Sequence, residues 1–376
     1  MGSATTDLNG TGSSSEGSEC ASEGRAVPVR PNPPLIEGRL KRVLVTGANG
    51  FVGSHLVEAL VARGDEVTCF VRKTSDLKRL EPYDVRICKG DVTDPESVKA
   101  AINGHEVVYH VAGVAATVGR KRVYEINGQG VHHVAEACGG LTTPPVLVVV
   151  SSLAAAGPAK QGKPKTEADP TEPVSHYGRS KLAGETAATA FVDRIPTTIV
   201  RPPIVVGEAD TLAFELFQMI WRFRMHMMVG LGRSCYSIVH ASDLARLLIL
   251  AAEHGKRLRP AEDNDTARQG YYFAGCDMTP SYAELGRLVA SALDRRVMLV
   301  PSLPRAIWPT AAVLGVWGRF RRHPGLLDID KAREATAGSW MCSAQRAVDE
   351  LGYSVAATLP ERLRQTAEWY RQEKWL

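Results

Sequence analysis

Short apolar runs alternate with helical patterns of hydrophobic residues along most of this chain. Six of the runs have the aliphatic and β-branched character of buried strands, at 42–46, 66–71, 84–90, 106–113, 146–152 and 197–203. One helix between them has a clear start signal, because Asp94 stands at the N-cap position and Pro95 at the first helical position. Continuous apolar strands that alternate with helices predict an α/β fold with a doubly wound parallel sheet, covered on both faces.

The first 38 residues break this pattern. They are rich in Gly, Ser, Thr, Glu and Pro and hold too few apolar side chains to form a core, so we expect residues 1–38 to be a disordered tail. The tail lacks the charged start and the apolar stretch of a signal peptide, so we expect a cytoplasmic protein.

Composition and charge narrow the function classes. A net charge of only +4 over 376 residues argues against a nucleic-acid partner. The seven cysteines are scattered, odd in number and form no CxxC pair, which argues against a disulfide framework and against a metal site. No stretch reaches the roughly 18 uninterrupted apolar residues that cross a bilayer. Residues 306–322 could lie on a membrane, but a buried or substrate-covering helix is favoured. The sequence leaves open whether the chain forms a homodimer.

The stretch TGANGFVG at 46–53 places three glycines at three-residue intervals directly after the first predicted strand. The spacing of apolar residues after Phe51 is helical, so the glycines lie on a strand-to-helix turn. Such a bare turn lets backbone N–H groups approach a ligand, and the positive end of the helix dipole favours a phosphate. Because ligands of parallel sheets bind at the carboxyl ends of the strands, the position predicts a dinucleotide site rather than merely a tight turn.

The end of the second predicted strand bears on which dinucleotide binds. A carboxylate there accepts hydrogen bonds from the adenosine ribose of NAD, whereas a cation favours the additional 2′-phosphate of NADP. The strand ends in Phe70-Val71-Arg72-Lys73 and carries no carboxylate at that point. We therefore expect NADP as the cofactor, held by Arg72, with NAD as the alternative. The alternative interpretation is that Arg72 and Lys73 are ordinary solvated cations on the surface.

A second chemical signal is YGRSK at 177–181. Residues four apart share one face of a helix, so we expect the Lys181 ammonium, with an oxidised nicotinamide ring, to lower the pKa of the Tyr177 phenol. A phenol tuned in this way serves as a general acid and base. Upstream, Ser151 and Ser152 end the fifth predicted strand, where a hydroxyl can hydrogen-bond a substrate oxygen. Each signal alone has an ordinary structural explanation, but together they predict a catalytic site.

The motifs TGANGFVG, GDV at 90–92, YHVAG at 109–113, VSSLAAAG, YGRSK and VRPPIVVG occur in the order seen in extended short-chain dehydrogenases/reductases, the NAD-dependent epimerase/dehydratase group. The chain resembles this family from about Leu40 to its C-terminus. The Arg after the second strand resembles dihydroflavonol-4-reductases and 3β-hydroxysteroid dehydrogenases, and bacterial hopanoid-associated epimerase-like proteins look similar too. The resemblance implies a Rossmann domain over 39–205 and a smaller, mostly helical substrate lobe over 206–376, with some segments returning to the Rossmann core.

The resemblance also implies roles for individual residues. Ser152, Tyr177 and Lys181 would form the catalytic set, with Tyr177 as acid and base and Lys181 also holding the nicotinamide ribose. Asn127 would serve mainly in packing and positioning, and Pro203 would border the nicotinamide pocket. The implied cofactor-binding residues are Gly47, Asn49, Gly50, Phe51, Val52, Gly53, Arg72, Asp91, Val92, Ala112, Gly113, Tyr177, Lys181 and Pro202.

One departure from the family narrows the reaction. Nucleotide-sugar dehydratases place Asp-Glu directly after the catalytic hydroxyl, whereas this chain has Leu153-Ala154, so dehydration is not expected. The resemblance then implies an NAD(P)-dependent oxidoreductase that transfers hydride between the nicotinamide and a secondary alcohol or ketone. A nucleotide-sugar epimerase is the alternative. A non-catalytic NAD(P)-binding sensor is a third hypothesis, although such members commonly lose the Tyr and Lys that this chain keeps.

The predicted substrate lobe gives a hint at the small-molecule substrate. Residues 214–230 carry three Phe, one Trp and four Met, a composition that suits a pocket for bulky apolar ligands as well as ordinary helix packing. Together with the apolar stretch 306–317, it favours a cyclic substrate of sterol, terpenoid or flavonoid size. Arg233 keeps the nucleotide-sugar alternative open, since such enzymes often place a phosphate contact in the corresponding stretch.

Overall fold

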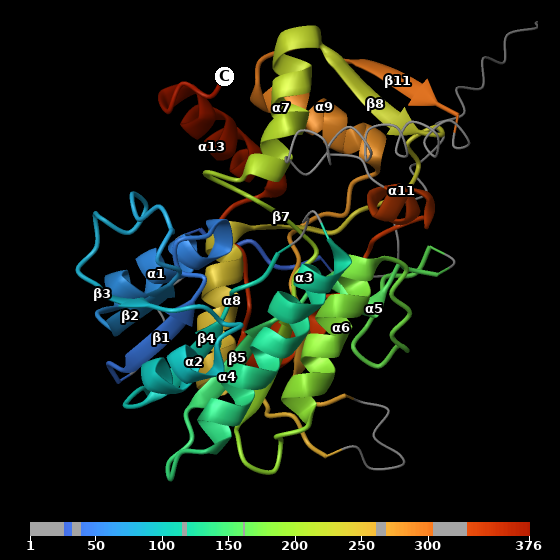
Figure 1. Cartoon of the computed structure of the whole chain (residues 1–376). Coiled ribbons are helices and arrows are strands. Elements are labelled where there is room, and N and C mark those ends of the chain that lie inside the picture. Colours follow the sequence, from blue (N-terminus) through green and yellow to red (C-terminus); the bar gives the residue numbers. More distant parts are fainter. Residues whose placement is uncertain (1–25, 32–38, 115–118, 161, 261–267, 304–328) are drawn as a thin grey trace, which may run out of the picture.

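A seven-stranded, all-parallel sheet forms the centre of the computed structural model, which describes residues 26–31, 39–114, 119–160, 162–260, 268–303 and 329–376 (Figure 1). The strand order is β10-β6-β5-β4-β1-β2-β3. The strands are β1 (Arg42–Thr46), β2 (Glu66–Val71), β3 (Arg86–Lys89), β4 (Val107–His110), β5 (Val146–Val150), β6 (Thr197–Arg201) and β10 (Tyr271–Phe273). The predicted doubly wound parallel sheet is confirmed. The three-residue β10 was not foreseen, because so short a run has no readable period.

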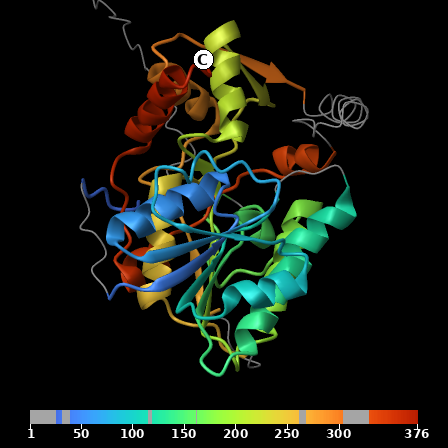
Figure 2. The ribbon, with the colours of Figure 1, turned by 60° about the vertical axis from the view of Figure 1, so that its left-hand side comes forward.

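Helices cover both faces of the sheet (Figure 2). One layer holds α1 (Phe51–Arg63), α8 (Ala241–His254) and α12 (Gln345–Leu351), and the other holds α2 (Pro95–Ile102), α4 (Gly130–Gly139) and α6 (His176–Thr189). Successive strand residues supply the two cores in turn: Val43 and Val45 pack with the first layer, and Leu44 packs with the second. The Asp94 side chain accepts a hydrogen bond from the Glu96 N–H at the start of α2, as predicted.

A smaller lobe lies at one end of the sheet domain, beyond β7 (Ile204–Val206), which pairs with β9 (Ile238–His240) (Figure 1). Its helices are α7 (Thr211–Phe223), α9 (Tyr282–Ala292) and α13 (Leu359–Gln372), and its two parallel strands are β8 (Met225–Val229) and β11 (Met298–Ser302). Phe217, Leu285 and Leu363 belong to its separate core. The segments α8, β10 and α12 come from the C-terminal half but pack in the sheet domain.

Part of the predicted disordered tail is packed. Val27 is buried in the core that contains α1 and α8. The Pro28 carbonyl accepts a hydrogen bond from the Val355 N–H at 3.1 Å, and the Val355 carbonyl accepts one from the Arg30 N–H at 2.9 Å. The expectation of disorder is therefore wrong for residues 26–31, since a distant strand-like residue supplies the partner that local composition does not reveal. Residues 1–25 and 32–38 lie outside the described part of the chain.

The described residues also bear on the cysteines and on the membrane question. Free thiols are found at Cys69, Cys88, Cys138, Cys276 and Cys342. Within the ranges given above, no helix is long and apolar enough to span a bilayer. The candidate membrane segment 306–322 falls outside those ranges.

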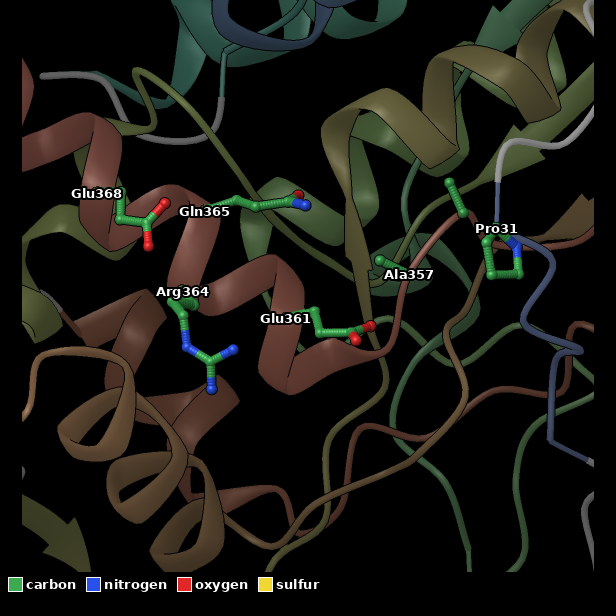
Figure 3. Close-up of a pocket in the computed structure, with 7 residues that line it drawn as sticks. Pro31, Ala357, Glu361, Arg364, Gln365 and Glu368 are labelled. Atoms are coloured by element: carbon green, nitrogen blue, oxygen red, sulfur yellow. The ribbon is translucent and has the colours of Figure 1, made fainter.

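A surface pocket of about 300 Å³ lies where the packed N-terminal segment meets α13 (Figure 3). Its lining residues are Pro31, Ala356, Ala357, Glu361, Arg364, Gln365 and Glu368. None of the site residues predicted from the sequence lines this pocket.

Candidate active site

The glycine-rich turn joins the end of β1 to the start of α1. Gly47 has a φ of +67°, which favours glycine, and a Cβ there would lie 2.8 Å from the Cα of Ala112. A Cβ on Gly53 would collide with the Gly47 carbonyl oxygen, which also accepts a hydrogen bond from the Gly50 N–H at 3.0 Å. No side chain caps the N-terminus of α1. Uncapped N–H groups and a bare turn fit the phosphates of a dinucleotide.

Thr46 ties this turn to the end of the neighbouring strand β4. Its Oγ1 lies 3.1 Å from Nδ1 of His110 and accepts a hydrogen bond from the Ala112 N–H at 3.2 Å. Ala112 is thereby held beside the glycine turn, and Gly113 follows it in the chain. Asn49, Phe51 and Val52 are half-buried on the turn and first helical residues.

Charged side chains gather where β2 and β3 end. Arg122 Nη2 lies 3.5 Å from Oδ2 of Asp91, and Thr93 donates to Oδ1 of Asp91 through its N–H at 2.9 Å and its hydroxyl at 2.8 Å. Burial raises the pKa of Asp91, but the Thr93 hydrogen bonds and the charges of Arg122 and Arg72 outweigh it and hold this pKa below its usual value. Arg72 is exposed beside this carboxylate, and Val92 is buried. Sequence reasoning missed Arg122, which no motif marks.

Ser152 and Tyr177 lie near each other at the end of β5, and the Ser152 hydroxyl acts on the pKa of the Tyr177 phenol. Ser152 is the N-cap of the short helix α5 (Leu153–Ala156), and its Oγ accepts from the Ala154 N–H at 3.1 Å. Tyr177 lies in the first turn of α6. The Leu153 N–H donates to the Pro202 carbonyl at 2.8 Å, which fixes the predicted Pro202 beside the same strand end.

The pKa of Tyr177 differs from the expectation. Burial raises this pKa, and the nearby Ser152 hydroxyl and the charge of Lys331 lower it only in part. Lys181 does not act on the phenol in this structure, because its Nζ donates to the Val150 carbonyl at 3.0 Å. The expected lowering of the Tyr177 pKa by Lys181 is therefore not found.

Lys181 itself is buried between the Val150 carbonyl and the backbone of Gly113. A Cβ on Gly113 would stand 2.8 Å from Lys181 Nζ. Burial lowers the pKa of Lys181 to about 8, although the negative charge of Glu185 opposes the shift. The ammonium thus lies against Gly113, one of the residues that the family resemblance implies for cofactor binding.

A buried ion pair lies at the end of β5, and it binds one of the two serines found there. Arg201 donates from Nε and Nη2 to the Glu185 carboxylate at 2.8 and 2.6 Å. Ser151 donates its hydroxyl to the same carboxylate at 2.5 Å, whereas the Ser152 hydroxyl accepts from the Ala154 N–H. Sequence reasoning missed Glu185 and Arg201. The position of Glu185, four residues after Lys181 on α6, was the available signal.

Asn127 holds the chain that borders the groove. It lies in a π-helical turn, Glu125–Gln129, which follows α3 (Arg120–Tyr124). Its Oδ1 accepts from the Val114 N–H at 2.9 Å, and its Nδ2 donates to the Val114 carbonyl at 3.0 Å and to Ser180 Oγ at 2.9 Å. These contacts match the positioning role implied by the family resemblance. A π-helical turn at such a place is common at functional sites.

The short helix α11 (Ile329–Thr336) packs against the start of α6 and was not foreseen. Oδ2 of Asp330 accepts hydrogen bonds from the N–H groups of His176 and Tyr177, at 2.7 and 3.2 Å. Lys331 Nζ lies 5.8 Å from the centre of the Tyr177 ring. Because α11 comes about 150 residues later in the chain, local sequence could not show that it caps this helix.

The Met- and aromatic-rich stretch 214–230 is divided between α7 and β8, with Arg224 in a left-handed conformation between them. Phe217 and Met228 are buried, which is ordinary core packing, while Phe223 and Met227 are 64% and 55% exposed. Arg233 is exposed. The stretch therefore contributes in part to the core of the smaller lobe. Its exposed side chains are accessible to a substrate.

Three kinds of comparison agree with this architecture. Residues 43–264 match the model of the NAD dependent epimerase/dehydratase family. A ceramide reductase of Caulobacter vibrioides is 28% identical over 334 residues, covering 89% of this chain and 96% of the reductase. The 3 beta-hydroxysteroid dehydrogenase type 7 of Mus musculus is 27% identical over 355 residues, with 87% and 94% covered. A Thermus thermophilus UDP-glucose 4-epimerase in complex with NAD has the same fold, with a TM-score of 0.68 at 22% identity over 88% of this chain and 99% of the epimerase.

Proposed function

Since the chain belongs to the NAD-dependent epimerase/dehydratase family, we propose that it is an oxidoreductase that interconverts a secondary alcohol and a ketone. The proposal rests on the closeness of the Ser152 hydroxyl to the Tyr177 phenol at the end of β5, where the Lys181 ammonium also lies, against Gly113. A bound nicotinamide supplies the hydride acceptor or donor. The chain's own residues supply the proton and the binding sites.

Tyr177 moves the proton in this proposal. In the direction of oxidation, its phenolate takes the proton of the substrate hydroxyl, and in reduction its phenol returns a proton to the substrate oxygen. Ser152 orients that oxygen through its hydroxyl. The Lys181 ammonium, which donates to the Val150 carbonyl, would hold the nicotinamide ribose, and its positive charge would favour the phenolate. The pKa of Tyr177, raised by burial, suits the proton-donating, reductive direction.

NADP is the proposed cofactor. Exposed Arg72 follows β2, where an acidic residue would select NAD, and Arg122 adds a second guanidinium within 3.5 Å of Asp91. Gly47, Gly50 and Gly53 would accommodate the pyrophosphate against the N-terminus of α1. Asp91 and Val92 would border the adenine, and Pro202 and Pro203 the nicotinamide.

A bulky apolar alcohol or ketone is the proposed substrate class. The ceramide reductase and the 3 beta-hydroxysteroid dehydrogenase are named for apolar substrates, and each covers most of this chain. Leu153-Ala154 after the catalytic serine does not provide the acid and base that dehydration needs. The nucleotide-sugar epimerase is the second candidate, and exposed Arg233 is the observation that favours it.

A substrate panel tests the proposal. The purified protein is mixed with NADPH or NADP⁺ and with cyclic apolar ketones or alcohols, and the absorbance of the reduced nicotinamide is followed. In parallel, UDP-glucose and UDP-galactose are incubated with the protein and analysed for epimer formation. We expect turnover of the apolar compounds. Turnover of the UDP-sugars alone would replace this proposal with the epimerase.

A further inference from the structure

The Lys331–Glu334 ion pair lies over the catalytic tyrosine. Lys331 Nζ is 2.8 Å from Oε2 of Glu334 and 5.8 Å from the centre of the Tyr177 ring. The charges of both side chains act on the Tyr177 hydroxyl. Because Asp330 anchors α11 to the first turn of α6, this pair is held beside the place where a substrate oxygen would meet Tyr177.

The second carboxylate oxygen of Glu334 is unsatisfied. Oε1 is buried and has no hydrogen-bond partner among the residues that the structure describes. The backbone of Glu334 is fixed, because its carbonyl accepts a hydrogen bond from Trp340 Nε1 at 2.9 Å. Around Tyr177 the neighbouring side chains are largely apolar, with Trp340, Tyr236 and Ala337 in one cluster. A buried acceptor in such surroundings costs free energy unless a donor is supplied.

We propose that Glu334 recognises the substrate: its Oε1 accepts a hydrogen bond from a hydroxyl or amide N–H that the substrate carries near the reacting carbon. The ammonium of Lys331 beside it disfavours a cationic amine, so the donor is neutral. This inference rests on the proposed oxidoreductase function and narrows its substrate class. Apolar hydroxy ketones, diols and hydroxy amides are then preferred over ketones and alcohols with a single oxygen.

Matched ketones test this role. Wild-type protein and the variants Glu334→Leu and Glu334→Gln are assayed with NADPH on cyclododecanone and on its 2-hydroxy and 3-hydroxy derivatives. Glu368→Gln, which neutralises an exposed glutamate on α13, is the control. We expect wild-type kcat/KM to be about 10- to 100-fold higher for the better hydroxy ketone than for the plain ketone, as a hydrogen bond to a charged acceptor gives. Glu334→Leu should bring this ratio close to one, and Glu334→Gln should leave it in between.

The loss should fall on the hydroxy ketone alone, with NADPH affinity and melting temperature near those of Glu368→Gln. Equal wild-type values for the three ketones would overturn the inference and leave the oxidoreductase standing, as would an equal loss on all three in Glu334→Leu. Dissociation constants of the same ketones, from quenching of tryptophan fluorescence in the NADP⁺ complex, separate the two proposals. Glu334-dependent preference in binding without any turnover would support this inference and contradict the proposed reaction.

Discussion

The Lys181 ammonium lies directly against the backbone of Gly113, where a Cβ would stand 2.8 Å from Lys181 Nζ. A side chain at position 113 would therefore clash with Lys181, which holds the ribose in the proposed mechanism. Gly113 is exposed and has no left-handed φ, so backbone freedom does not explain a glycine at this position. The close approach of the buried Lys181 ammonium does explain it.

Gly113→Ala should push the Lys181 ammonium away from the groove. We expect NADPH to bind about tenfold more weakly and turnover to fall by at least as much, because a displacement of about 1 Å can cost catalysis that much or more. Fluorescence titration with NADPH measures the first effect. Gly139→Ala, where a Cβ meets only ordinary contacts at 3.5 Å, is the matched control. An NADPH affinity equal to that of the wild type in Gly113→Ala would show that cofactor binding does not depend on the present position of Lys181.

Arg72→Ala tests the choice of cofactor. We expect the wild type to bind NADPH more tightly than NADH, and the variant to lose most of that difference, because a guanidinium contact to a phosphate is removed. The matched variant Lys73→Ala removes the neighbouring exposed cation and should have a smaller effect. Titration of both cofactors by fluorescence gives the ratio, and equal affinities in the wild type would rule out the NADP assignment.

The packed N-terminal segment gives a stability prediction. Deleting residues 1–25 should leave the free energy of unfolding nearly unchanged, whereas Val27→Ala should lower it by about 2 kcal/mol, because a buried side chain leaves the core. Urea denaturation of the two proteins beside the wild type makes the comparison. An undiminished stability in Val27→Ala would show that the segment packs without contributing to the fold.

His110 predicts a loss of stability in acid. Burial, followed by the charge of Lys181, lowers its pKa from 6.5 to about 3. Between these values the unfolded chain binds a proton that the folded protein does not, so the free energy of unfolding falls as the pH drops from about 6.5 to about 3, by up to about 1.4 kcal/mol per pH unit. His110→Asn should flatten this slope, measured by urea denaturation at several pH values. His254→Asn removes an exposed histidine as the control, and an identical slope in His110→Asn would contradict the assignment.

The sheet and its glycine turn were predictable because their signals are local. Val43, Leu44 and Val45 are buried on both faces of a parallel sheet, and such strands read as continuous apolar runs. The catalytic helix was predictable for the same reason, since Tyr177 and Lys181 are four residues apart.

What escaped prediction depends on partners far along the chain. Val27 finds its place against a segment that includes Val355, and the first turn of α6 is capped by Asp330. The pKa of Tyr177 follows from burial, which the YGRSK motif does not contain. The segment 306–317, offered as part of the substrate site, lies outside the described residues and stays a prediction.

The most direct measurement of the central claim is hydride transfer by Tyr177→Phe. The variant keeps the ring and removes the proton carrier, so NADPH should bind as in the wild type while reduction of the best ketone falls by about 100-fold or more. Lys181→Met should damage both binding and turnover, which distinguishes the two roles. Transfer of deuterium from labelled NADPH to the product carbon, followed by mass spectrometry, reports the reaction itself. Transfer in Tyr177→Phe at most of the wild-type rate would contradict the account.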